Sequence, residues 1–194
     1  MKQFWYGLAL LLFLALPPVR DLLESVMAFH MHMQMLLLFV SGLLMAPFFQ
    51  KHFGGVFDKY NKTGLPGVVL FLVILLYWML PRTMDEALEI WFVELWKFVS
   101  LPFLAGVPLR DSWKKISQTF EIVVFMILMV IFSVMTYLYI FSESTLCNNY
   151  LMIDQQTVGW GFAFFVLCIV MYILLVLFTD QSQYFGDDSE ESGA

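Results

Sequence analysis

Residues 120 to 141 read FEIVVFMILMVIFSVMTYLYIF, and this run of 22 residues decides the fold. Glu121 is its only charged residue. The hydrocarbon core of a bilayer is about 30 Å thick, and roughly 20 apolar residues in an α-helix cross it. Inside the hydrocarbon every backbone N–H and C=O group needs an internal partner, which a helix supplies. The run is therefore predicted to be a transmembrane helix.

The rest of the chain has a similar composition. Hydrophobic residues make up 61% of the 194 residues, charged residues make up 13%, and the mean hydropathy is +0.80. A soluble domain typically contains roughly 25% charged residues. Further apolar runs cover residues 4–18, 26–49, 65–80, 90–107 and 158–178. We predict an all-α, polytopic transmembrane bundle of about six spans within residues 1–179.

The two ends of the chain differ from the spans. The first apolar run lacks the small-residue cleavage site of a secretory signal peptide, so we expect it to be retained as a short span. Residues 180–194 contain five acidic residues and no Lys or Arg, and we expect this tail to be solvated and disordered. The chain has no basic stripe suited to nucleic acid. The expected partners are membrane lipid and other membrane proteins.

Basic residues are unequally divided between the two sides of the membrane. With six spans both termini lie on one side, which collects seven Lys and Arg residues against two on the other. The seven are Lys2, Lys51, Lys59, Lys62, Arg110, Lys114 and Lys115, and the two are Arg20 and Arg82. Positively charged loops remain in the cytoplasm. We therefore predict cytoplasmic termini.

This orientation places three unusual polar segments at the outer membrane face. MAFHMHMQM, residues 27–35, opens the second span. WMLPRTMDEALE, residues 78–89, joins the third span to the fourth, and CNNYLMIDQQ, residues 147–156, leads into the sixth. Segments that are far apart in the sequence are thus predicted to converge on one face.

Histidine and methionine alternate in the first of these segments. An ideal helix turns 100° per residue, so one face collects Met27, His30, Met31 and Gln34, with Met35 at its margin. His32 points roughly 160° away from His30. A single metal ion is therefore not expected to bind both histidines.

Thioether and imidazole groups together suit Cu(I), which is a soft cation. We predict a Cu(I) site built on His30, with partner ligands from the other outer segments. The partner candidates are Met79, Met84 and Met152. The alternative is that the methionines only fill apolar gaps, while the histidines hydrogen-bond a carbonyl group or water.

Acidic residues supply further candidate positions. Glu94 lies inside the fourth span, where an ionisable group is costly and suggests function, but it could equally pair with Lys97 at i, i+3. Asp85 and Glu89 share a helical face and could receive a hard cation or assist copper. Such acids also stabilise the solvated start of a helix.

Asp154 precedes the sixth span and is expected to cap that helix rather than bind metal. The chain has no nucleophile elbow, phosphate-binding loop, HExxH motif or haem-binding CxxCH motif. We therefore do not expect an enzyme.

The three outer segments resemble the cytochrome c oxidase assembly factor CtaG family. That family shows His-Met-x-Gln-His running into leucines, where this chain has MHMQMLLLF at residues 31–39. It shows Trp-His-x-Pro followed by an aromatic residue, Asp, Ala and Leu, where this chain has WMLPRTMDEAL at 78–88. It shows Asp-Gln-Gln followed by Gly and Trp, where this chain has DQQTVGWGF at 154–162. The resemblance spans about residues 30 to 165.

The resemblance implies a polytopic protein that supplies copper to an oxidase. Family histidines are replaced by Met31, Met35 and Met79, and Val93 and Lys97 stand near the positions of family histidines in the fourth span. The replacements are compatible with two alternatives. Either the chain retains a softer Cu(I) site, or it is a relative of the family that kept the fold and lost the metal.

Two functions of different classes follow from these observations. The first is a copper-binding assembly factor or chaperone in a bacterial or archaeal inner membrane, which holds Cu(I) near the outer face for a respiratory oxidase or another copper enzyme. The second is a non-catalytic accessory subunit that binds no metal within a larger membrane complex.

Overall fold

A computed structural model describes residues 2–179 of the chain, and this part is helical without a strand. Four helical stretches are long and apolar enough to cross a membrane, and the count rises to six if each of two bent helix pairs is one span. The prediction of an all-α transmembrane bundle is thereby confirmed. The predicted tail at 180–194 lies outside the described residues.

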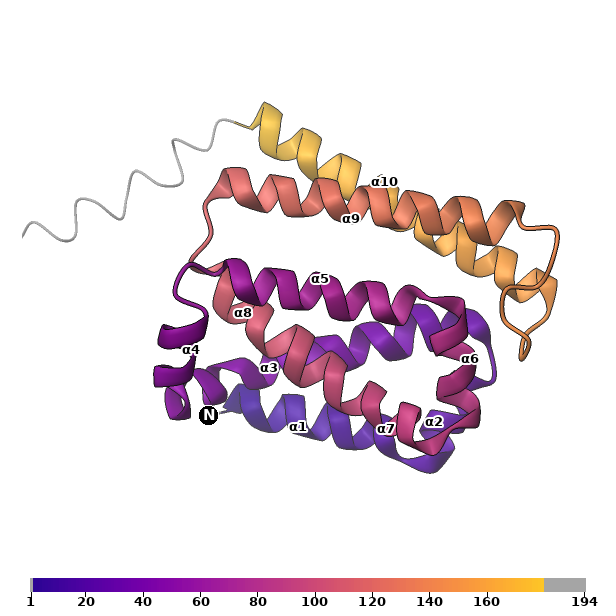
Figure 1. Ribbon diagram of the computed structural model, residues 1–194, viewed down its shortest axis with the longest axis horizontal. Helices are drawn as coiled ribbons and strands as arrows, with labels where there is room; N and C mark the ends of the chain where they lie inside the picture. The colour runs from indigo at the N-terminus through magenta and orange to yellow at the C-terminus, as the bar shows by residue number, and fades with distance from the viewer. Residues whose placement is uncertain (1, 180–194) are drawn as a thin grey trace, which may run out of the picture.

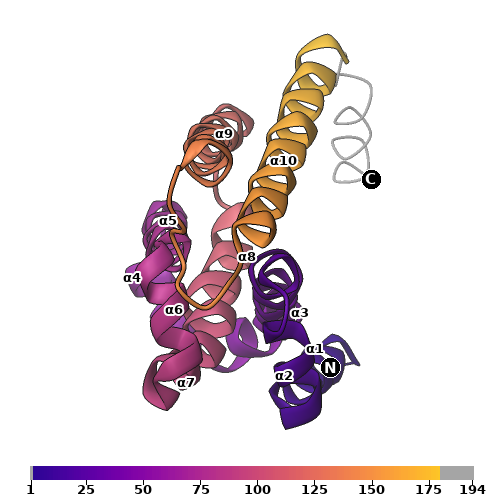
Figure 2. The same ribbon diagram turned by 90° about the vertical axis from the view of Figure 1, so that its right-hand side faces the viewer.

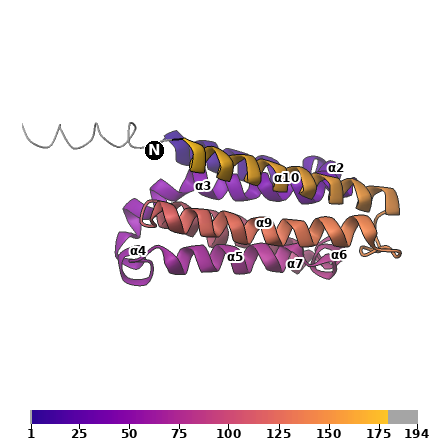
Figure 3. The same cartoon turned by 90° about the horizontal axis from the view of Figure 1, so that it is seen from above.

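The helices run back and forth between two ends of the molecule (Figures 1 and 3). Helix α1 (Lys2–Ala15) leads to the short α2 (Pro17–Glu24), and η1 (Phe29–Gln34) with α3 (Met35–His52) returns. Three helices follow: α4 (Gly54–Tyr60), α5 (Leu65–Met79) and α6 (Pro81–Glu89). The next stretch is continuous and consists of α7 (Trp91–Val99), η2 (Ser100–Gly106) and α8 (Val107–Trp113). Helices α9 (Gln118–Phe141) and α10 (Met152–Phe178) form a hairpin. Helices α2 and α6 and the α9–α10 loop lie at one end of the bundle, and α4 lies at the other.

Two sharp bends place the short helices across the ends of the bundle. Helix α2 departs from α1 by 71°, because Leu16 is extended and Pro17 and Pro18 begin a new helix. Helix α5 departs from α4 by 91°, and Gly64 supplies the left-handed conformation in the turn, at φ 76°. The connection between the predicted spans 26–49 and 65–80 contains α4 and is largely helical. The fourth span, predicted to end near residue 107, continues through α8 to Trp113.

The bundle has two layers, and the α9–α10 hairpin forms one of them (Figure 2). Helix α9 packs mainly against α10, and the hairpin meets the other layer chiefly where α10 contacts η1. At that contact Gly161 faces the His32 ring so closely that a methyl group on Gly161 would overlap it. The hairpin is therefore attached to the rest of the bundle mainly near one end.

The other layer is centred on a close crossing of α3 and η2. A Cβ atom on Gly42 would overlap the backbone carbonyl of Pro102, and a Cβ atom on Gly106 would come within 2.6 Å of the Phe39 carbonyl oxygen. Small residues let membrane helices approach closely enough for backbone contact. The two glycines therefore fix how near the second and fourth spans approach each other.

Candidate functional site

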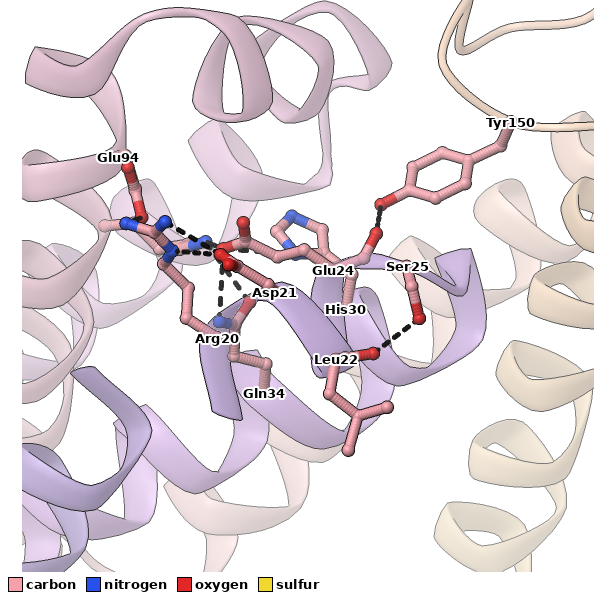
Figure 4. Close-up of polar contacts among 10 residues, drawn as sticks. Arg20, Asp21, Leu22, Glu24, Ser25, His30, Gln34, Glu94 and Tyr150 are labelled. Carbon is pink, nitrogen blue, oxygen red and sulfur yellow. Dashed lines mark hydrogen bonds and ion pairs between the residues drawn. The ribbon is translucent and has the colours of Figure 1, made fainter. Parts of the chain in front are cut away.

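Charged and polar side chains gather where α2, η1 and α7 meet. Lys97 of α7 is wholly buried, and its Nζ atom donates to Glu24 Oε1 at 2.5 Å and to Gln34 Oε1 at 3.2 Å. Gln34 in turn donates through Nε2 to Glu24 Oε1 at 3.2 Å (Figure 4). One carboxylate oxygen of Glu24 thus accepts hydrogen bonds from two spans, and we call the set around it the Glu24 cluster.

Arg20 and Glu94 extend the Glu24 cluster. Arg20 Nη1 lies 3.0 Å from Glu94 Oε1, and Arg20 also pairs with Asp21 at 2.7 Å (Figure 4). The direct Glu94–Lys97 ion pair, one of the two alternatives for Glu94, does not form, because each of the two residues pairs with a residue of α2. The bend before α2 folds Arg20 and Glu24 back toward α7, a rearrangement that spacing along α7 alone does not indicate.

His30 lies inside the Glu24 cluster. Its side chain is wholly buried, and its Nδ1 atom is 4.0 Å from Glu24 Oε1 (Figure 4). Within residues 2–179 neither ring nitrogen meets the geometry of a hydrogen bond, although the Gln34 side chain lies beside the ring. The ring nitrogens of His32 are likewise buried without a partner. Buried polar groups in native proteins almost always have a partner, so an unpartnered one requires an explanation such as a bound ion or water.

The charges of the Glu24 cluster do not balance. Three carboxylates, from Asp21, Glu24 and Glu94, face two basic groups, from Arg20 and Lys97. The Asp21 side chain is 63% exposed, whereas those of Glu24 and Glu94 are 13% and 20% exposed. With His30 neutral, the Glu24 cluster has one surplus negative charge. A single positive charge at His30 would neutralise it.

Both regions of π-helix lie beside the Glu24 cluster. Segment η1 contains His30 and Gln34, and η2 begins at Ser100, three residues after Lys97. Ser100 Oγ accepts a hydrogen bond of 2.9 Å from Nε1 of the buried Trp78. Short π-helical turns occur frequently at functional sites.

The structure divides the expected group of metal ligands between two places. His30 and Gln34 face the Glu24 cluster, whereas His32 lines a separate cavity together with Met31, Met35 and Met79. His32 stacks on Phe165, with the ring centroids 5.2 Å apart. The two histidines therefore diverge, as the helical spacing predicts, and three of the methionines lie on the His32 side.

The remaining methionine candidates are more dispersed. Met27 and Met84 are buried, and neither lines the His32 cavity. Met152 begins α10, where its sulfur accepts a 3.7 Å contact from Gln155 Nε2. Over the described residues, no three His, Cys, Asp or Glu side chains are placed to hold a metal ion together. A site with three side-chain ligands in this part of the chain would therefore need at least one donor of another kind.

Asp85 and Glu89 hold the α9–α10 loop. Asp85 Oδ2 accepts from the Asn148 backbone N–H at 2.8 Å, while the Asn149 amide donates to Asp85 and to Glu89, each at 3.4 Å. Tyr150 donates through its hydroxyl to the Glu24 carbonyl at 2.7 Å (Figure 4). The loop thus connects α6 to the Glu24 cluster, and the three polar segments converge as predicted.

Asp154 does not cap α10, which corrects the sequence prediction. The helix begins at Met152, three positions earlier than a cap at Asp154 requires, so that Leu151 occupies the cap position and no side chain caps the helix. Asp154 instead lies in the first turn, where its charge suits the helix dipole. The neighbouring Gln155 is buried and accepts from the Leu146 N–H at 2.7 Å, so it is the residue that organises the loop.

Cys147 provides a measure of whether this loop stays closed. Its thiol is buried against the Pro81 carbonyl, and burial, together with the nearby Asp85 carboxylate, raises the pKa of Cys147 to about 12. Because the thiolate is the reactive form, we expect Cys147 to react slowly with maleimide in the folded protein. Asp85→Ala releases the Asn148 N–H and should accelerate the reaction.

The rate is measured by mass spectrometry in a Cys168→Ser background, which leaves one thiol. Glu86→Ala is the matched control, because Glu86 pairs with the exposed Arg82 and not with the loop. Equal rates in the Asp85→Ala variant and its parent would show that Asp85 does not hold the loop over Cys147.

Comparison with known proteins provides no family assignment. No family model, curated protein or solved structure matches this chain. The Glu24 cluster and its surroundings are therefore the basis for a functional proposal.

Proposed function

We propose that this protein is a membrane copper-binding assembly factor or chaperone that holds Cu(I) at His30. The client in this proposal is a respiratory oxidase or another copper-dependent membrane enzyme. The observation that carries the proposal is the wholly buried His30 ring, whose nitrogens form no hydrogen bond to the described residues, in a cluster with one surplus negative charge.

The surplus charge favours a monovalent ion. A charged group inside a membrane is costly unless it is compensated. A Cu(I) ion beside His30 would bring the Glu24 cluster to neutrality, whereas a divalent ion would leave it positive. His32 has no ion pair in the part of the chain that the structure describes, so an ion there would remain uncompensated.

His30 would supply an imidazole nitrogen to the ion, and Met27 and Met31 would supply thioethers. Met31 is buried next to His30 in η1, although it also lines the His32 cavity, and Met27 is buried just before η1. Thioethers bind Cu(I) without first losing a proton, and imidazole suits the same ion. Such a site has no thiolate to retain the ion strongly, which fits a protein that passes its metal to a partner.

The location is part of the same proposal. The excess of basic residues at the end that carries the N-terminus favours a cytoplasmic position for that end. The Glu24 cluster, at the opposite end, then lies near the outer face of a bacterial or archaeal inner membrane. Copper would be delivered on that side.

The test is competition for Cu(I) between the purified protein and a chelator under reducing conditions. We expect one Cu(I) per chain, and His30→Ala should weaken binding by about tenfold or more, which corresponds to about 1.4 kcal/mol. Met31→Leu should weaken binding less, while His32→Ala and Met35→Leu should leave it nearly unchanged. His32→Ala is the matched control, because it removes an imidazole from the same π-helical segment.

Circular dichroism must show that each variant remains helical. Absence of copper from the wild-type protein, or wild-type affinity in His30→Ala, would overturn the proposal. A non-catalytic accessory subunit without metal would then be the better interpretation.

A further inference from the structure

A cavity of about 140 Å³ lies between the α9–α10 hairpin and the other layer of the bundle. One side of it is formed by residues of η1, α3, α5 and η2, including Trp78 and Ala105, and the other by residues of α9 and α10, including Leu128 and Phe162. It is distinct from the Glu24 cluster, because neither Glu24, His30, Gln34 nor Lys97 lines it.

The lining of the cavity is apolar. His32 and Trp78 are the lining residues whose side chains carry nitrogen. The His32 ring is packed against Phe162 and Phe165, and the Trp78 N–H donates to Ser100 Oγ. A cavity of about 150 Å³ with apolar walls remains dry and accepts a benzene-sized molecule. The chemistry and the volume therefore favour a hydrocarbon group over water.

The cavity extends to the lipid-facing surface of the protein. Trp78 and Ala105 in its wall are almost completely buried, whereas Leu36 in the same wall is 49% exposed. Most lining residues belong to helical stretches that are long and apolar enough to cross a membrane. The hydrocarbon nearest to Leu36 is then the acyl chain of a membrane lipid.

We propose that this cavity binds a segment of a lipid acyl chain, inserted between the hairpin and the other layer. The inserted segment fills space that the side chains leave empty, and it contributes contacts between two layers that otherwise meet mainly near Gly161. Met31 lines this cavity and is also a ligand in the proposed copper site, but the acyl-chain site rests on the volume and apolar walls of the cavity and not on bound copper.

Trp78 is a suitable reporter of the inserted chain. Its side chain is wholly shielded from the surface, and the hydrogen bond to Ser100 Oγ fixes its ring. Bromine atoms on a lipid quench tryptophan fluorescence only at short range. A variant that retains Trp78 as its single tryptophan is reconstituted into phosphatidylcholine vesicles, with either brominated or unmodified acyl chains.

Despite its burial, Trp78 should be quenched in the brominated vesicles to nearly the same fraction as Trp160, which faces lipid on α10. Ala105→Leu places extra methyl groups in the cavity and should abolish most of the quenching of Trp78. Leu128→Phe fills the cavity from the opposite wall and should also reduce the quenching of Trp78. This second variant keeps the test informative if Ala105→Leu fails to fold. A variant with Trp160 as its single tryptophan is the control, because neither substitution should change its quenching.

Two results would overturn the proposal. The first is an absence of quenching at Trp78 while Trp160 is quenched normally. The second is unchanged quenching of Trp78 in both filled variants, which would show that the bromine atoms reach Trp78 by another route. Copper binding is not needed for either measurement.

Discussion

Replacing Lys97 by methionine should lower the free energy of unfolding by about 3 to 5 kcal/mol, because it removes one partner of a buried ion pair. The substitution keeps an unbranched apolar side chain but leaves Glu24 with an uncompensated negative charge beside His30. The measurement is unfolding in detergent micelles, followed by circular dichroism. No other single charge substitution in the described part of the chain is expected to have a larger effect.

The double variant Lys97→Met/Glu24→Gln should regain most of this loss. Glutamine retains the shape of Glu24 without its charge, and replacing both ionised groups of a buried pair often costs little. Arg82→Met is the matched control: it breaks the Arg82–Glu86 pair, in which the Arg82 side chain is 90% exposed, and should cause no measurable change. A double variant as unstable as Lys97→Met alone would refute the charge argument.

Gly42→Ala should be the most damaging single-methyl substitution. The added Cβ would overlap the backbone of Pro102, and neither helix backbone can rotate away as a side chain would. Overpacking of this kind typically costs about 1 to 3 kcal/mol, occasionally more, and the backbone contact places Gly42→Ala at the upper end. The substitution should therefore reduce the free energy of unfolding by about 3 kcal/mol.

Gly55→Ala is the matched control for this substitution. Gly55 also lies within a helix, but a Cβ atom added there meets nothing within 4 Å. Since alanine favours helix more than glycine does by about 1 kcal/mol, Gly55→Ala should be neutral or stabilising. Equal destabilisation by the two variants would show that the crossing of α3 and η2 is looser than the structure indicates.

The sequence predicted the features that depend on hydropathy. The spans can be recognised in the sequence because the backbone N–H and C=O groups of each long apolar run need internal hydrogen-bond partners inside the hydrocarbon, and a helix supplies them. The convergence of the outer segments followed from the number of crossings, since alternate connections lie on the same side. Neither the positions of the spans nor the convergence of the outer segments depends on which side chains meet.

The pairings within the Glu24 cluster could not be predicted in the same way. Glu24 is a partner of Lys97 because α2 bends by 71° from α1, and the angle of a bend is not encoded in residue spacing. The one available signal was the i, i+4 spacing of Arg20 and Glu24, which puts both on one face of a short helix. The π-helical turns also fall outside the prediction, which assumed 100° per residue.

Gln155 illustrates a different difficulty. Asp154 and Gln155 are adjacent polar residues at the start of a span, and their order does not show which one the loop surrounds. The position at which α10 begins decides between the two residues. The helix begins at Met152, and this start directs Gln155 toward Leu146.

The order in which the chain is synthesised gives the α9–α10 hairpin a particular role. Chains emerge from the ribosome N-terminus first, so α1 to α8 enter the bilayer before the hairpin does. They already contain the Lys97–Glu24 pair and the Gly42 crossing. The hairpin then arrives in a membrane where lipid already covers the exposed wall of the first layer. Its docking through Gly161 and Tyr150 encloses whatever hydrocarbon lies there, so the cavity can acquire its occupant during biogenesis without a gate that opens later.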